Sequence, residues 1–305
     1  MRYSLTSRVR GALIGGLIGQ SLAATQPESY YWIKVASQGM ESLIAEERFY
    51  LNAGHKFQQQ EWNLEKPSNL MLGNIILATL PIAIFFHENN IKLRENLLKA
   101  IESYHHPYIR DGVLAVCYLI AQSLNEKIDR QTNQNRLVSE ITSFIGETTT
   151  DLPNKLQQVN NLIVENAGYS ELQNCLGKEN NIANTIAIAF YCFATTKEDF
   201  RLTCLRATTI DKQNSEICAA IAGAVSGAYN SMAGIPITWH LGLDEAKLAQ
   251  WGITNFSQMV KLADALVSVW SGAYHELPQS LEAKEDRDLI SPDQAIAAPY
   301  IIRLR

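Results

Sequence analysis

The first third of this chain contains no aspartate: the first one is Asp111, although the 305 residues include 31 acidic side chains. A group of aspartates, which are preferred ligands of hard divalent cations, is therefore excluded from residues 1–110. Clusters of basic residues are also absent, because no run of Lys or Arg is longer than a pair, and the net charge is −5. The composition thus argues against nucleic acid as a partner.

Cysteine spacing excludes two further kinds of site. The five cysteines include no Cys-x-x-Cys pair, so neither a zinc site nor a disulfide framework is expected. They are predicted to be small, buried hydrophobic residues of a reducing compartment, which places the protein in the cytoplasm. The chain also has no Gly-x-Ser-x-Gly nucleophile elbow and no phosphate-binding P-loop, and the residues alone imply no cofactor.

A hydrophobic run of membrane-spanning length without polar interruptions is missing. The uncharged stretch 67–86 contains Asn69, Asn74 and Pro81, which favour a core helix kinked at Pro81 over a bilayer span. Residues 1–24 combine basic residues with an apolar run, as secretory signals do. Four glycines and Gln20 interrupt that run, so we expect a core helix there and no membrane partner.

Strand signals are scarce, since the chain has no Asn-Gly or Asp-Gly turn and no run of strict alternation. Helical periodicity dominates instead: in residues 256–270 the apolar side chains recur at i, i+3, i+4 and i+7. Residues 181–194 are apolar all round, which predicts a helix in the middle of the molecule. The sequence therefore predicts a single compact all-α, multi-helix domain over residues 1–305.

Local signals predict some helix ends. Gly146 and Gly168 follow amphipathic stretches and are expected to end them in the left-handed conformation. Thr195 and Glu198 have the spacing of a capping box, which predicts a helix start.

Two ladders of small residues at a spacing of four are a distinctive helical feature. A helix with such a ladder presents a smooth face on which another backbone can approach closely. Because glycine inside a helix costs about 1 kcal/mol relative to alanine, we expect close packing to compensate, with the two helices central and in contact. The ladders consist of Gly11, Gly15 and Gly19, and of Ala219, Gly223 and Gly227.

Three segments together resemble the ADP-ribosylglycohydrolases, enzymes that remove ADP-ribose from modified proteins and related substrates. RVRGALIGGLIGQSLA is similar to the family's opening helix, and YHHPYIRDGVLAVCYLIAQSL to its His-Pro segment and the helix after it. CAAIAGAVSGAYNSMAGIPITW is similar to the family's Ala/Gly helix and the exit from it. The three segments occur in the family's order and span almost the whole chain. The resemblance implies the family's all-α fold.

The resemblance also implies a metal site, which this sequence alters. In the family, two divalent ions, usually magnesium or manganese, lie between a Thr-Asp-Asp-Thr cluster in the N-terminal third and an Asp-x-Asp-Thr cluster before the Ala/Gly helix, where they can activate water or hold the ribose. The first cluster cannot exist here without aspartate, and Gln20 stands where the opening helix would carry its Asp. The second cluster falls on KQNSEI, where the two glycines become Lys212 and Gln213, the acids become Asn214 and Glu216, and the threonine becomes Ile217.

The candidate ligand-binding residues are therefore Asn214, Ser215, Glu216, Asp211 and His106. We interpret Glu216 as an acid in the first turn of a helix capped by Asn214 or Ser215, stabilised by the helix dipole by about 0.3–1 kcal/mol. A surviving metal ligand is the alternative. Asp211 is expected to face solvent. His106, which precedes Pro107, is expected to mark a helix start rather than a catalytic group.

Three hypotheses for function follow. The loss of acidic ligands beside preserved packing motifs favours a non-catalytic relative, without a metal cofactor, that binds a partner protein or a nucleotide-like small molecule in the old cleft. The second is an ADP-ribosyl hydrolase with a rebuilt site, in which Glu216 with Asp211 or Asp264 would hold magnesium or manganese. The third is a structural scaffold with no small-molecule site.

Overall fold

The computed structural model describes residues 3–24, 31–46, 48–49, 67–128, 134–176, 180–241 and 256–273. All of them lie in one compact unit, residues 1–273, and residues 274–305 form a second unit outside the described part. The expectation of a single domain over residues 1–305 therefore stays a prediction.

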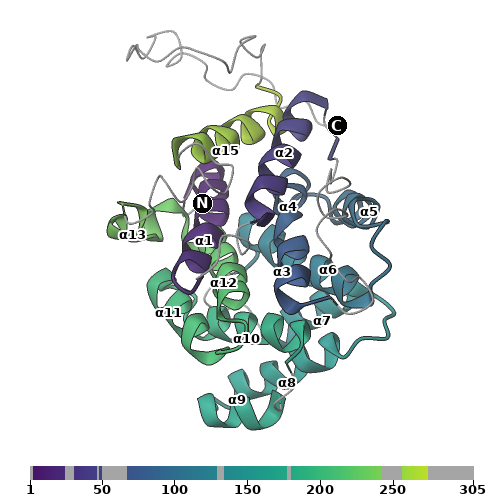
Figure 1. The fold of residues 1–305 in the computed structure, drawn as a ribbon, viewed down its shortest axis with the longest axis vertical. Helices are drawn as coiled ribbons and strands as arrows, with labels where there is room; N and C mark the ends of the chain where they lie inside the picture. Colours follow the sequence, from purple (N-terminus) through teal and green to yellow (C-terminus); the bar gives the residue numbers. More distant parts are fainter. Residues whose placement is uncertain are drawn as a thin grey trace. The chain divides into compact units, whose positions relative to one another are not determined.

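The described part is built of helices, and no strand occurs in the ranges given above. This confirms the all-α prediction (Figure 1). The first half contains α1 (Leu5–Ser21), α2 (Tyr31–Glu46), α3 (Asn69–Ala78), α4 (Leu80–Phe85), α5 (Asn90–Ala100), α6 (Pro107–Leu124) and α7 (Gln134–Ile145). The second half contains α8 (Leu152–Val164), α9 (Tyr169–Leu176), α10 (Ile182–Thr195), α11 (Phe200–Ile210), α12 (Ser215–Asn230), the 3-10 turn η2 (Met232–Gly234), α13 (Ile237–Leu241) and α15 (Phe256–Trp270).

The two ladders of small residues pack against each other, as predicted. Helices α1 and α12 make the most extensive helix–helix contact of the described part, and α11 lies along α12 (Figure 1). A Cβ atom on Gly15 would overlap the carbonyl oxygen of Gly223, and one on Gly227 would overlap the carbonyl oxygen of Gly11. The pairing runs from Gly11 with Gly227 to Gly19 with Ala219, so the helices are antiparallel and the end of α1 lies beside the start of α12.

Helices α3, α6 and α10 form much of the remaining core. The stretch that begins at residue 67 breaks at Thr79 into α3 and α4, with Pro81 near the start of α4, which confirms the predicted interruption there. In α10 every residue is buried except Ile188 and Thr195, as expected for a helix that is apolar all round. Within the described ranges, no helix has both the length and the hydropathy that a membrane crossing requires.

The predictions for helix ends were only partly correct. Gly146 has φ +76° just after α7, as predicted. Helix α8 ends earlier than expected, and Asn166, with φ +53°, takes the left-handed position in place of Gly168. The capping-box prediction was wrong as well, because Thr195 is the last residue of α10 and Asp199 caps α11 through the N–H of Leu202. A short acidic side chain that can accept from the first turn takes the cap position here.

Candidate functional site

Four helices of the core, α3, α6, α10 and α12, begin at the same end of the unit. A side chain at Gly73, in α3, would meet Ile217 in the first turn of α12. In the same way Gly112, in α6, lies against Ile76 of α3 and Ile186 of α10. Because each helix N-terminus carries about half a positive elementary charge, this end of the unit favours electronegative groups.

Three asparagines join the starts of α3, α10 and α12. The side-chain oxygen of Asn180, just before α10, accepts hydrogen bonds from the side-chain nitrogens of Asn69 at 2.6 Å and of Asn214 at 2.8 Å. Asn69 is the first residue of α3, and Asn214 directly precedes α12. The N-terminal third and the segment before α12 are therefore linked through Asn180, and the linking side chains are all amides.

Asp211 does not face solvent, and that expectation was wrong. The residue is 8% exposed, and its two carboxylate oxygens have different hydrogen-bond partners. One accepts from the hydroxyl of Thr185 at 2.7 Å, and the other from the backbone N–H of Asn214 at 3.0 Å. The carboxylate thus holds the connection between α11 and α12 against α10. Its partner on α10, Thr185, lies 26 positions away in the chain.

The start of α12 differs in detail from the predicted cap. Asn214 occupies the N-cap position, but its side chain makes no capping hydrogen bond, because it is bound to Asn180. Asp211 accepts the N–H of Asn214 instead. Ser215 and Glu216 follow as the first two helical residues, both half-buried. Glu216 therefore lies in the first turn, where a negative charge interacts favourably with the helix dipole.

His106 is the N-cap residue of α6, in agreement with its expected place at a helix start. Its ring lies 5.9 Å from that of Tyr108, and the Nδ1 atom is buried without a hydrogen-bond partner among the described residues. Burial lowers the pKa of this histidine. A neutral imidazole at this position can take part in binding, and in the part of the chain that the structure describes no carboxylate is hydrogen-bonded to it that would make it a general base.

Asp264 is used elsewhere. Its carboxylate accepts from Arg10 at 2.6 and 2.5 Å, which ties α15 to α1. Arg10 and Gln20 lie ten residues apart on α1, about 15 Å along the helix, and it is the Gln20 end that lies beside the start of α12. The structure thus separates Asp264 from Glu216, against the hypothesis that the two share an ion.

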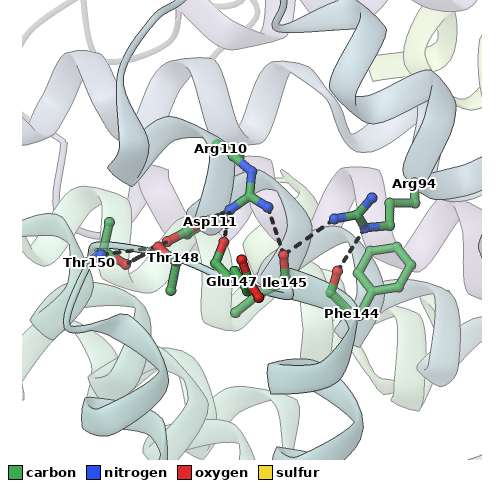
Figure 2. Close-up of polar contacts among 8 residues, drawn as sticks. All are labelled: Arg94, Arg110, Asp111, Phe144, Ile145, Glu147, Thr148 and Thr150. Carbon is green, nitrogen blue, oxygen red and sulfur yellow. Dashed lines mark hydrogen bonds and ion pairs between the residues drawn. The ribbon is translucent and has the colours of Figure 1, made fainter.

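A second polar cluster lies where α6 begins (Figure 2). Asp111 is completely buried and accepts from Arg110 at 2.7 Å, from Thr150 at 2.5 Å and from Thr148. Arg110 also donates to the carbonyl oxygens of Ile145 and Glu147. The cluster fastens the α7–α8 connection to α6, so the first aspartate of the chain is a packing residue and not part of an open site.

The cysteines also pack in the interior. All five are free, and Cys175 is the only one that is not fully buried. Burial raises the pKa of Cys192 to about 12, and raises the pKa of Cys218 well above its ordinary value. Because the thiolate is the reactive form, these buried thiols are not nucleophiles near neutral pH.

Comparison with known proteins decides the family. A family model described as ADP-ribosylglycohydrolase matches residues 37–276. The chain belongs to the ADP-ribosylglycohydrolase family. A solved structure titled "ADP-ribosylglycohydrolase-related protein complex" has the same fold, with a TM-score of 0.57 and 16% sequence identity over 86% of this chain and 97% of that chain. No curated protein sequence matches this chain.

The residues present do not fit the two ions of the ADP-ribosylglycohydrolase family. Magnesium and manganese require several converging oxygen atoms, most of them anionic. Here the amide oxygen of Asn180 already accepts two N–H groups, and the side-chain oxygen of Gln20, at the end of α1, accepts the indole N–H of Trp32. Among the residues that the structure describes, no three His, Cys, Asp or Glu side chains are grouped in a way that could hold a metal ion.

Sequence reasoning identified the segment before α12 but missed its partners. Asn69 and Asn180 lie 145 and 34 positions from Asn214, and no local signal marks either of them. Thr185 was missed for the same reason, because its hydroxyl matters only through Asp211. Such pairs join different helices, so they can be identified only from the three-dimensional structure.

Proposed function

We propose that this ADP-ribosylglycohydrolase relative has lost two-metal hydrolysis and acts by binding a partner protein or a nucleotide-like small molecule where α3, α6, α10 and α12 begin. The observation that carries this proposal is the hydrogen-bonded group of Asn69, Asn180 and Asn214. An ion site needs oxygen atoms directed at the cation. In this group the oxygen of Asn180 already accepts two N–H groups. The three side chains are therefore satisfied without a cation.

The charges near the start of α12 support the same proposal. Asp211 is buried and held by Thr185 and Asn214, and the exposed Lys212 follows it directly. The starts of four helices add partial positive charge. With few carboxylates to offset them, these groups favour an anionic or strongly polar ligand over a cation.

Hydrolysis of ADP-ribosylated arginine tests the proposal. We expect the full chain with magnesium or manganese to release no more ADP-ribose than a sample without protein, because the ligands for an activated water are missing. Glu216→Gln is the matched variant and is expected to leave this result unchanged. Magnesium-dependent release of ADP-ribose that disappears in Glu216→Gln would overturn the proposal and assign a rebuilt hydrolase site.

A further inference from the structure

Helix α15 packs against α1 and α2 (Figure 1), and two of its polar or aromatic contacts differ in burial. Near the middle of the helix, the carboxylate of Asp264 binds Arg10, and both side chains are partly exposed. At the last residue of the helix, the ring of Trp270 packs on that of His87, with the two ring centroids 4.9 Å apart. His87 is 3% exposed, so the contact at the end of α15 is made by a buried, titratable group.

The connection between α4 and α5 holds His87 in a fixed orientation. The Nδ1 atom lies 2.7 Å from the carbonyl oxygen of Ile84. Because a carbonyl oxygen only accepts, Nδ1 carries the proton when the ring is neutral. The carbonyl oxygen of His87 in turn accepts from the side chain of Asn125, just after α6, at 2.6 Å. The ring that Trp270 contacts is therefore held by α4 and α6 together.

A second buried cation acts on His87. Arg8, on α1, is also 3% exposed and donates to the carbonyl oxygen of Leu124. Its Nε atom is buried and has no hydrogen-bond partner among the described residues. The ion pair of Arg8 with Glu126 is loose, with 3.7 Å between the nitrogen and oxygen atoms. The positive charge of Arg8 is thus only partly compensated where it faces His87.

These surroundings favour the neutral form of His87. Burial lowers the pKa of His87 most; the carbonyl oxygen of Ile84 and the exposed Glu88 raise it, and Arg8 lowers it. The indole of Trp270 has no charge, although an aromatic face attracts a cation by about 0.5–2 kcal/mol. The net direction of the pKa is downward. The stability that His87 contributes is therefore complete above a pH of about 6.5, the ordinary value, and is lost as the pH falls below it.

We propose that His87 forms a pH-sensitive contact that holds the end of α15 when its ring is neutral and releases it when the ring is protonated. A protonated ring places a second positive charge beside Arg8, in a position where water cannot solvate either group well. The last turns of α15 then separate from the α4–α5 connection, while the other helices stay packed. This proposal does not depend on the proposed function, because it concerns α15 and not the helix starts around Asn180.

Hydrogen exchange of the full chain, followed by mass spectrometry at about pH 7.5 and about pH 5.5, tests the proposal. After correction for the intrinsic effect of pH on exchange, peptides of α15 are expected to exchange at least about twofold faster at the lower pH, and peptides of α10 are expected to stay unchanged.

Two variants remove the titration of His87 in different ways. His87→Phe keeps a ring against Trp270, and His87→Asn keeps an N–H for the carbonyl oxygen of Ile84. Both are expected to abolish the pH response of α15. His106→Asn is the control, because the pKa of His106 is also lowered by burial but this residue lies about 27 Å away along α6 from the end near His87. It is expected to leave the pH response of α15 intact.

Four results would contradict this assignment. The first is exchange of α15 that does not change with pH in the unchanged chain. The second is slower exchange at the lower pH, because the attraction of the charged ring to Trp270 would then dominate. The third is a pH response that persists in a folded variant without His87. The fourth is equal loosening of α10 and α15, because His87 would then act on the whole unit and not on the end of α15.

Discussion

Gly15→Ala is expected to lower the free energy of unfolding by about 3 kcal/mol, at the upper end of the range for overpacked cores. The added Cβ atom would overlap the carbonyl oxygen of Gly223, which belongs to the backbone of a buried helix and cannot rotate away. Helices α1 and α12 would have to move apart along their whole contact. Thermal unfolding of the full chain measures this, with a fall in Tm of roughly 6–12 °C.

Gly16→Ala is the matched control, one residue further along the same helix. A Cβ atom there would lie 3.4 Å from the Cβ of Ala224, an ordinary van der Waals distance. We expect this variant to be neutral or more stable by up to about 1 kcal/mol, because alanine is the better helix former. Equal stability of the two variants would mean that the close approach of α1 and α12 does not hold the fold together.

Asp111→Ala is expected to be about as damaging as Gly15→Ala, with a loss of about 3 kcal/mol. The substitution removes the acceptor for Arg110, Thr148 and Thr150. A buried donor left without a partner lowers the free energy of unfolding, because its lost hydration is no longer offset by a hydrogen bond. The expected loss lies at the low end for buried pairs, because the side chain of Arg110 is 32% exposed. Denaturant unfolding with a linear extrapolation measures the change.

Asp264→Ala serves as the control, since it also removes an aspartate that binds an arginine. The side chains of Arg10 and Asp264 are 36% and 37% exposed, and pairs this accessible contribute no more than about 1 kcal/mol. If Asp264→Ala cost as much as Asp111→Ala, burial would not be the reason that the Asp111 cluster matters. The two variants together therefore separate burial from charge pairing.

Much of the fold could be predicted, because its strongest signals are local. The spacing of small residues in α1 and α12 encodes a close helix pair, and the apolar surface of α10 encodes a central position. The break before Pro81 follows from the missing N–H and fixed φ of proline. Predictions of helix ends failed where a neighbouring residue could also end or cap the helix. Asn166 replaces Gly168 at the end of α8, and Asp199 replaces the predicted capping box before α11.

The candidate site was less predictable, because its contacts join distant parts of the chain. The residues on either side of Asp211 give no sign that it is buried, and from the local sequence alone an aspartate there is expected to be exposed. It is buried because it accepts a hydrogen bond from the hydroxyl of Thr185, on another helix. The replacement of acids by Asn214 and Gln20 could be read from the resemblance to the family. The partners of those amides, Asn180 and Trp32, could not.

Manganese titration followed by electron paramagnetic resonance tests the central claim most directly, because free and bound Mn²⁺ give different spectra. We predict that the signal of free Mn²⁺ stays undiminished when the protein is added, since amides hydrogen-bonded to one another do not form an oxygen site for hard cations. A variant with Asn69→Asp and Asn214→Asp, which introduces two carboxylates into the group of amides around Asn180, is expected to bind more Mn²⁺ than the unchanged chain. Tight uptake of two equivalents of Mn²⁺ by the unchanged chain would contradict the account and restore the protein to the two-metal hydrolases.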